Sequence, residues 1–347
     1  MALRISLLED PPVRAFLDGM LQRALGTRTG IDVSALGLGC WAIGGPFTFD
    51  GKPAGWGEVD DDESIRAVRR ALDLGVTLFD TADAYGCGHS ERVLGEALAG
   101  RRDDAVISTK VGLVFDEATR TGGGTDLSPG HLRRACDASL RRLGTDRIDL
   151  YLIHGGLEAA EDVPPVVEVL EELVAAGKLR WYGSSVSDPA VVRAMAEGPH
   201  MVAAQHELNV LRGEMETLTV AEELGLASLN RTPLAMGLLS GRYRPDMLPA
   251  DDDVRRNSPW WDFFTEGAME GWLERIADAR AELTADGRTL AQGALGWIWG
   301  RGPATLPLAG FRTVAQVEEN AGAAAFGPLP AERMERIRAI LGEPLPA

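Results

Sequence analysis

The stretch TLFDTADAYGCGHSE, residues 77–91, begins as an apolar strand and becomes strongly polar within a few positions. A strand that merely ends needs only a turn residue such as glycine or asparagine. Asp80, Asp83 and Tyr85 therefore add more polar groups than a chain reversal requires. This excess indicates a functional site at the end of the strand.

Seven further apolar runs rich in β-forming residues occur along the chain, and amphipathic helical patterns separate most of them. Together the eight runs are residues 35–41, 76–82, 105–110, 148–154, 181–186, 202–209, 227–234 and 304–310. Such alternation implies parallel strands, and eight of them predict an α/β fold, the (β/α)8 TIM barrel. Because the active sites of these barrels lie at the C-terminal ends of the strands, we expect Asp80, Lys110 and His154 on one face.

No linker, internal repeat or low-complexity tract divides the chain. We therefore expect an N-terminal extension over residues 1–19 and a single barrel domain over residues 20–347. A short hairpin beginning near Met20 is expected to cover the lower end of the barrel. The polar segment 242–270 is too irregular for a core and predicts a loop over the barrel mouth.

Charge and cysteine content argue against several classes of partner. A net charge of -17 disfavours a broad surface for nucleic acid or an acidic membrane, so an anionic ligand would need local donors. The three cysteines are odd in number and lack the spacing of a zinc site, which favours a reducing cytoplasm. Apolar runs are too short to span a membrane, and the first residues lack a signal-peptide core. We expect a cytoplasmic protein without nucleic-acid or membrane partners.

The polar residues at the strand ends suggest a proton donor. A tyrosine is a poor acid at neutral pH unless a cation stabilises its phenolate, and Lys110 is placed to supply that cation to Tyr85. Asp80, on the neighbouring strand, would keep a partly buried Lys110 charged. His154 would orient the phenol and a substrate oxygen. Together these four residues predict acid catalysis on a carbonyl compound.

These motifs resemble the aldo-keto reductase family, in its bacterial NADPH-dependent form. FDTADAYG, STK and YLIH match the family's tetrad in chain order, which implies Asp80, Tyr85, Lys110 and His154 as catalytic residues. The similarity runs from Met20 to Ala324 through SERVLGEAL, GKLRWYGSSVSD, PLAMGLLSGRY and GFRTVAQVEENAGA. The family fold is a (β/α)8 barrel, in agreement with the strand count.

The resemblance also implies NADP(H) as the cofactor, bound across the barrel mouth. Ser185 and Gln205 match positions that hold the nicotinamide carboxamide, and Val186 stands where an asparagine is common. Arg231 stands where many members place an aromatic ring, and a guanidinium can also stack. The other implied contacts are Trp41 and Asp80, then Thr232, Leu234, Gly237, Ser240 and Arg242 around the pyrophosphate, and Gly310, Phe311, Arg312, Gln316, Glu319 and Asn320 around the adenosine.

Arg312 precedes a predicted helix start, so we expect it to bind the 2′-phosphate. Trp41, together with Trp56, could instead line the substrate pocket or pack a loop. Cys87 is more simply a small loop residue than a redox switch. His89 and Glu91 suggest a metal pair, although a helix start explains them more simply, so no metal is expected.

Two functions remain open at this point. The favoured one is NADPH-dependent reduction of an aldehyde, ketone or keto-sugar to an alcohol, with Tyr85 as the proton donor. The alternative is a cofactor-binding regulatory or sensory module that resembles the potassium-channel β subunits. A metal-dependent barrel hydrolase is disfavoured because the first strand lacks a histidine pair. The identity of the small carbonyl substrate and the oligomeric state are left open.

Overall fold

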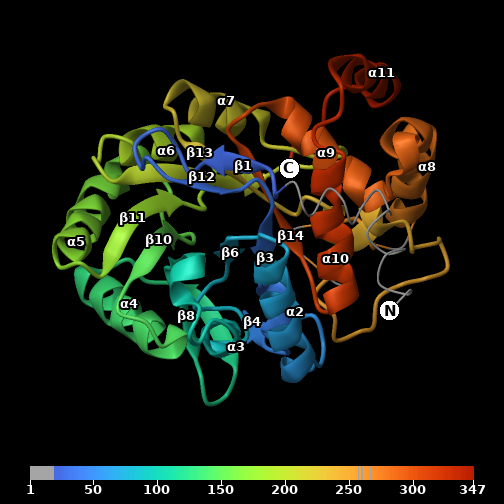
Figure 1. Cartoon of the computed structure of the whole chain (residues 1–347). Coiled ribbons are helices and arrows are strands. Elements are labelled where there is room, and N and C mark those ends of the chain that lie inside the picture. Colours follow the sequence, from blue (N-terminus) through green and yellow to red (C-terminus); the bar gives the residue numbers. More distant parts are fainter. Residues whose placement is uncertain (1–18, 257, 259–260, 266) are drawn as a thin grey trace, which may run out of the picture.

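The computed structural model describes residues 19–256, 258, 261–265 and 267–347. The expected extension over residues 1–19 therefore lies, apart from Gly19, outside the described residues. Eight parallel strands close into a barrel (Figure 1), which confirms the predicted fold class. They are β3 (Gly37–Gly39), β6 (Leu78–Asp80), β7 (Val106–Val111), β10 (Ile148–Ile153), β11 (Leu179–Ser184), β12 (Met201–Glu207), β13 (Ala227–Arg231) and β14 (Thr305–Gly310).

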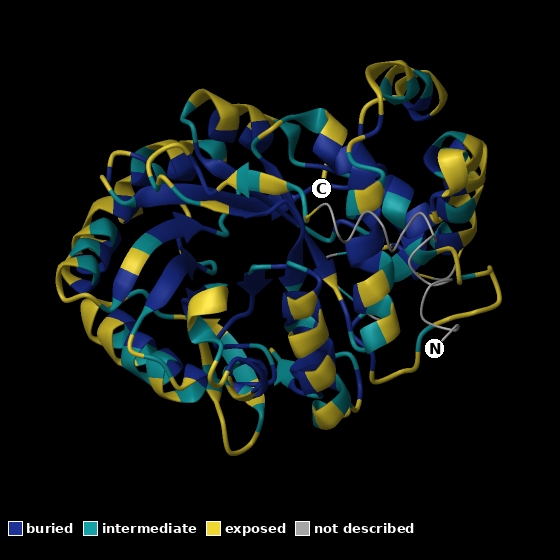
Figure 2. Ribbon diagram, in the orientation of Figure 1, coloured by how far each residue is buried: buried dark blue, intermediate teal, exposed yellow. Residues whose placement is uncertain are grey.

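Helices surround the barrel, and burial alternates with exposure along most of them (Figure 2), whereas α9 is buried over almost its whole length. The α-helices are α2 (Asp61–Asp73), α3 (His89–Ala97), α4 (Pro129–Leu143), α5 (Val163–Ala175), α6 (Pro189–Met195), α7 (Met215–Glu223), α8 (Ala268–Leu283), α9 (Leu290–Arg301), α10 (Val314–Gly322) and α11 (Ala331–Leu341). Short 3-10 helices are η2 (Trp41–Ile43), η3 (Arg102–Asp104), η4 (Ala160–Asp162), η5 (Ala235–Ser240), η6 (Ala285–Gly287) and η7 (Ala323–Ala325). Among the described residues, no helix has both the length and the apolar character needed to cross a bilayer.

The register of the strands brings the polar strand ends to one level. Asp80 is the last residue of β6 and pairs with Ser108 of β7, while Lys110 of β7 pairs with Leu152 of β10. His154 directly follows β10, and its backbone N–H donates to the carbonyl of Val111 over 2.7 Å. The barrel therefore places the expected residues at the same C-terminal end.

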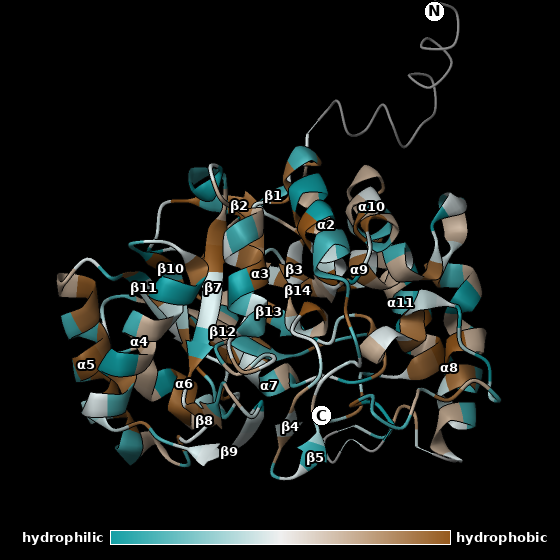
Figure 3. Ribbon diagram, turned by 90° about the horizontal axis from the view of Figure 1, so that it is seen from below, coloured by the Kyte–Doolittle hydropathy of each residue, from teal (hydrophilic) through white to brown (hydrophobic). Residues whose placement is uncertain are grey.

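A hairpin closes the opposite end of the barrel. It consists of β1 (Gln22–Ala24) and β2 (Asp32–Ser34), paired antiparallel. Leu25 and Val33 of this hairpin are fully buried against barrel residues such as Leu150. Figure 3 shows β1 and β2 on the side of the barrel opposite to β4 and β5. The hairpin expected from the sequence is confirmed.

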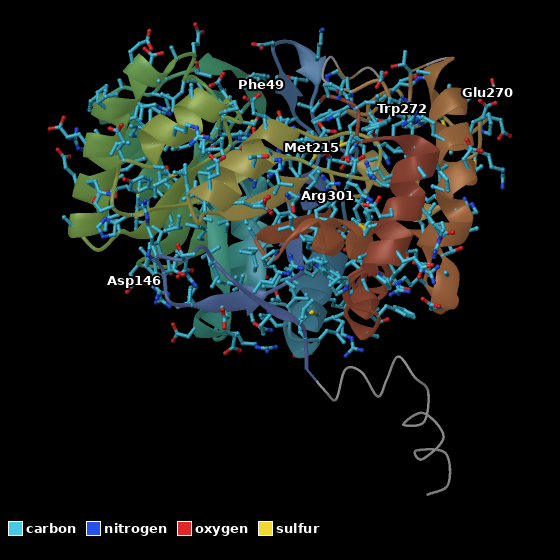
Figure 4. All side chains as sticks on the ribbon, turned by 90° about the horizontal axis from the view of Figure 1, so that it is seen from above. Phe49, Asp146, Met215, Glu270, Trp272 and Arg301 are labelled. Atoms are coloured by element: carbon cyan, nitrogen blue, oxygen red, sulfur yellow. The ribbon has the colours of Figure 1, made fainter. Side chains whose placement is uncertain are left out.

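A small sheet stands at the barrel mouth. Its strands are β4 (Thr48–Phe49), β5 (Lys52–Pro53), β8 (Leu113–Asp116) and β9 (Thr121–Thr125), in the order β5-β4-β9-β8. Figure 4 labels Phe49 of this sheet at one end of the molecule and Asp146, in a loop before β10, toward the other. The sheet joins the loops after β3 and β7, so it forms a wall of the mouth.

The burial of segment 242–270 differs from what the sequence predicts. It was expected to lie outside any core, yet Val254, Phe263 and Phe264 are buried in a second apolar cluster with Trp272 of α8. Helices α8 and α11, which the sequence patterns did not predict, pack on each other and on α9 (Figures 1 and 4). The expectation that this segment lies outside any core was wrong, because its aromatic side chains bury against the helix that follows it, α8, and against α9 and α11.

The connection after β6 depends on a close backbone approach at Gly86. Its φ is +61°, and a Cβ atom there would lie 1.8 Å from the carbonyl oxygen of Gly44. Gly124 has φ +71° but open space around its Cα. We therefore predict that Gly86→Ala lowers the free energy of unfolding by roughly 2–5 kcal/mol, because left-handed strain and a clash add up.

The matched variant Gly124→Ala should lose only about 1–2 kcal/mol, the cost of the left-handed backbone alone. Urea denaturation of both variants measures the difference. Equal losses would show that the contact between Gly44 and Gly86 does not constrain the connection.

Candidate active site

The centre of the site is a buried ion pair. Lys110 Nζ lies 2.6 Å from Asp80 Oδ2 and also donates to the carbonyl of Thr81 at 2.7 Å. Asp80 Oδ1 accepts from Ser108 Oγ at 2.9 Å and from Gln205 Nε2 at 3.0 Å. Burial lowers the pKa of Lys110, but the charge of Asp80 and the contact with Tyr85 outweigh burial and raise it overall. Lys110 is therefore a charged ammonium without access to water.

Tyr85 lies next to this ammonium. Its hydroxyl is 3.3 Å from Lys110 Nζ, and its ring contacts the ring of His154 edge-on at 5.9 Å between centroids. Three successive residues after it, Gly86, Cys87 and Gly88, have positive φ, which turns the chain sharply toward α3. Burial raises the pKa of Tyr85 although Lys110 counteracts it, so the phenol keeps its proton at neutral pH.

His154 is neutral in this environment. Burial, reinforced by the charges of Lys110 and Arg231, lowers the pKa of His154 to about 3. Its Nδ1 atom has no hydrogen-bond partner among the described residues. A neutral imidazole offers one N–H donor and one acceptor, which suits it to orient a ligand oxygen near Tyr85.

These residues open into a cavity of about 1300 Å³. Asp80, Tyr85 and His154 line it, whereas Lys110 lies behind Asp80 and does not. Every residue expected to contact the cofactor lines the same cavity, namely Trp41, Asp80, Ser185, Gln205, Arg231, Thr232, Leu234, Gly237, Ser240, Arg242, Gly310, Phe311, Arg312, Gln316, Glu319 and Asn320. One continuous space thus joins the polar strand ends to α10.

A chain of hydrogen bonds extends from the ion pair toward the expected nicotinamide position. Ser185 Oγ donates to Gln205 Oε1 at 3.0 Å, and Gln205 in turn donates to Asp80. Val186, which replaces the common asparagine, packs against the apolar core, and its backbone N–H donates to Ser184 Oγ. The amide of Gln205 is therefore held in one orientation by groups on both sides.

Two carboxylates that sequence reasoning missed hold Arg231. Its guanidinium lies 3.3 Å from Glu214 and 3.7 Å from Glu207, and both glutamates line the cavity. Glu207 follows Gln205 by two positions on β12, so period-2 alternation could have placed it on the same face. Glu214, beyond the strand, carried no comparable signal.

The chain after β13 fits a bound pyrophosphate. Thr232, Ala235, Met236 and Gly237 all have positive φ, so the backbone turns tightly beside the cavity. Ser240 Oγ is buried and has no hydrogen-bond partner within the described part of the chain. Small residues, turning backbone and an unused hydroxyl are the features by which a loop can approach phosphate oxygens.

At the adenosine end, Arg312 contacts other parts of the chain. Its guanidinium donates to the backbone carbonyls of Trp56, at 3.0 Å, and Glu58. These acceptors are neutral, and Arg312 forms no ion pair among the described residues. The positive charge expected to bind a 2′-phosphate is therefore present. The hydrogen bonds of the Arg312 guanidinium also connect the loop after β5 to the residues that follow β14.

Aromatic rings surround the Tyr85 hydroxyl. Trp41 stacks on Tyr85 with 5.7 Å between ring centroids, and Trp56 and Trp261 contact Trp41 at 5.6 and 5.9 Å. Trp261 comes from segment 242–270 and donates through Nε1 to Glu207 at 2.8 Å. The segment thus reaches the mouth as expected. Trp41 and Trp56 wall the space where a substrate would meet Tyr85.

The other sequence candidates have structural partners. His89 bonds to Asp61 at 2.9 Å, and Glu91 bonds to Arg142 and Thr109, both at 2.6 Å. Within the described ranges, no group of three or more His, Cys, Asp or Glu residues is arranged to hold a metal ion. Cys87 is buried and packs in a small apolar cluster.

Comparison with known proteins gives consistent matches. The chain matches the Aldo/keto reductase family over residues 35–342. It is similar to Aldo-keto reductase YhdN of Bacillus subtilis, with 32% identity over 304 residues that cover 84% of this chain and 85% of that protein. It is also 32% identical over 316 residues to an NADH-specific methylglyoxal reductase of Escherichia coli, covering 86% and 92% of the two chains.

A solved structure shows the same likeness. An aldo-keto reductase from Klebsiella pneumoniae, crystallised in complex with NADPH, aligns with a TM-score of 0.65 and 26% identity. The alignment covers 94% of this chain and 97% of that one.

The buried pair generates a first prediction for this site. Lys110→Met should lower the free energy of unfolding by about 3–5 kcal/mol, because it leaves the Asp80 carboxylate buried without its counter-charge. Lys178→Met is a matched control, since Lys178 pairs with Asp137 at 2.5 Å on the surface, where such pairs contribute about 0–1 kcal/mol. Adding Asp80→Asn to Lys110→Met should recover part of the loss. A double variant as unstable as the sum of both single variants would contradict the coupling.

The depressed pKa of His154 predicts a pH dependence of stability. Between pH 6.5 and about 3, the imidazole of His154 binds a proton in the unfolded state but stays neutral in the folded state. The stability contributed by this group should therefore fall as pH falls, by up to about 1.4 kcal/mol per pH unit. Urea denaturation between pH 5 and 7 should show a shallower slope for His154→Gln than for wild type. Parallel slopes would mean that His154 titrates normally.

Proposed function

Because the chain belongs to the aldo/keto reductase family, whose members reduce carbonyl compounds with a nicotinamide cofactor, we propose that it uses NADPH and that Tyr85 protonates the carbonyl oxygen. The observation that carries this proposal is the contact between the Tyr85 hydroxyl and the buried Lys110 ammonium at 3.3 Å. The product is an alcohol. An aldehyde, a ketone or a keto-sugar fits this chemistry.

The proton step follows from the electrostatics of the site. A nicotinamide bound in this cavity would supply the hydride that the carbonyl carbon accepts. Tyr85 gives its proton to the carbonyl oxygen, and Lys110 stabilises the phenolate that remains. The Asp80 carboxylate keeps Lys110 charged, and neutral His154 orients the carbonyl oxygen beside the phenol. Trp41 and Trp56 line this space.

The preference for NADPH rests on the adenosine end. Arg312 lines the cavity and keeps an uncompensated positive charge, which a 2′-phosphate can use. The solved relative from Klebsiella pneumoniae binds NADPH, which supports this choice. The relative from Escherichia coli is NADH-specific, so family membership alone supports only a nicotinamide cofactor.

Removal of the phenol hydroxyl tests the proposal. Tyr85→Phe should lower kcat by roughly 10²–10⁴-fold, because general acid assistance is lost while the pocket keeps its shape. The dissociation constant for NADPH, measured by quenching of tryptophan fluorescence, should stay the same. Tyr182→Phe is the control, since the Tyr182 hydroxyl bonds to Glu171 away from the cavity, and it should keep wild-type kcat.

Turnover of a panel of aldehydes, ketones and keto-sugars, followed by NADPH consumption, provides the assay. Near-normal kcat in Tyr85→Phe would refute the assignment of the proton donor. A wild-type protein that binds NADPH but turns over none of these compounds would favour a regulatory role.

A further inference from the structure

An acidic side chain occupies the helix end that faces the adenosine part of the cavity. Glu63, in the first turn of α2, reaches across to α10 and accepts the Val314 backbone N–H at 2.8 Å. Its other carboxylate oxygen accepts from Arg66 at 2.8 Å. Glu63 lines the same cavity as Arg312 and Thr313. The contact thus lies inside the proposed cofactor site and spans two helices that pack together.

Glu63 carries a negative charge in this position. The Val314 N–H, followed by the Arg66 guanidinium, holds the pKa of Glu63 below its usual value. Asp60 and Glu319 also line the cavity, as does the cation Arg312. Of these acidic groups, Glu63 is the one whose carboxylate bonds to a first-turn N–H of α10 within the described residues.

This N–H is a group that a phosphate would use. First-turn N–H groups of a helix bind phosphate through unpaired donors and the helix dipole, and Val314 is the first residue of α10. A 2′-phosphate carries roughly -1.5 to -2 charges and would have to displace the Glu63 carboxylate or lie beside it. A 2′-hydroxyl is neutral and can donate to that carboxylate. The Glu63 carboxylate would therefore repel the 2′-phosphate of NADPH and accept a hydrogen bond from the 2′-hydroxyl of NADH.

We propose that Glu63 is a specificity-determining residue that opposes the 2′-phosphate and favours NAD(H). The inference rests on the proposed function, because it concerns the same cofactor site. Arg312 attracts the phosphate and Glu63 repels it, so the ratio of NADPH to NADH affinity is set by the two residues together. Both residues form hydrogen bonds to neighbouring elements that lie more than 250 positions away in the sequence.

The experiment compares ligand binding in four proteins: wild type, Glu63→Gln, Asp62→Asn and Arg312→Ala. Glu63→Gln keeps a side-chain oxygen for the Val314 N–H but removes the charge. Asp62 is exposed in the same helical turn, so Asp62→Asn controls for the loss of one negative charge at a similar distance. Quenching of tryptophan fluorescence measures the affinities for NADPH and NADH, and isothermal titration measures those for 2′,5′-ADP and 5′-AMP.

Glu63→Gln should strengthen NADPH and 2′,5′-ADP binding by roughly tenfold or more, while NADH and 5′-AMP affinities change little or fall. The gain should shrink at high salt, because the repulsion is partly screened. Asp62→Asn should change all four ligands by a small and similar factor. Melting temperatures of the variants verify that each is folded.

Equal changes for the phosphorylated and unphosphorylated ligands in Glu63→Gln would overturn the inference, since Glu63 would then only join α2 to α10. Failure of both wild type and Glu63→Gln to bind 2′,5′-ADP would overturn it as well. The proposed use of NADPH fails separately, if Arg312→Ala leaves NADPH affinity unchanged. A wild type that prefers NADH but gains NADPH binding in Glu63→Gln would support Glu63 as the determinant.

Discussion

The desolvated ion pair between Lys110 and Asp80 is the constraint on which the rest of the site depends. Removing two charges from water costs several kcal/mol per ion, and their attraction offsets that cost only when every remaining polar atom has a partner. The Thr81 carbonyl, Ser108 and Gln205 provide those partners. They come from the loop after β6 and from two other strands, so the barrel must close before the pair is satisfied. The ion pair that contributes to the stability of the barrel is thus the same pair that contacts the Tyr85 hydroxyl.

The pair also determines what the neighbouring groups can do. Burial raises the pKa of Tyr85, so the phenol keeps its proton at neutral pH. The adjacent Lys110 ammonium would stabilise the phenolate once the proton has been transferred. The same positive charge, together with burial, keeps His154 uncharged. A neutral phenol and a neutral imidazole therefore lie side by side next to one ammonium. The aromatic rings of Trp41 and Trp56 add an apolar wall beside the Tyr85 ring.

The mouth of the barrel is built from segments with little regular structure of their own. The small sheet of β4, β5, β8 and β9 forms one side, and segment 242–270 forms another. The latter is held by its own apolar cluster with α8, α9 and α11 (Figure 1). Trp261 packs against this second core and donates to Glu207 of β12. Substrate choice can thus change through these segments while the strand ends keep their geometry.

The sequence by itself determined the eight strands, their parallel order and the placement of Asp80, Lys110 and His154 on one face, because hydrophobic periodicity is local and parallel strands must share one C-terminal face. The residues that the family resemblance implied as cofactor contacts also line the cavity. Only the tertiary structure decided the carboxylates that hold Arg231, the burial of Phe263 and Phe264, and the contact of Glu63 with α10. The physical reason is that each of these depends on a partner from another element of the fold, brought close by the barrel or by the second apolar cluster, and no local pattern encodes which group a side chain will meet.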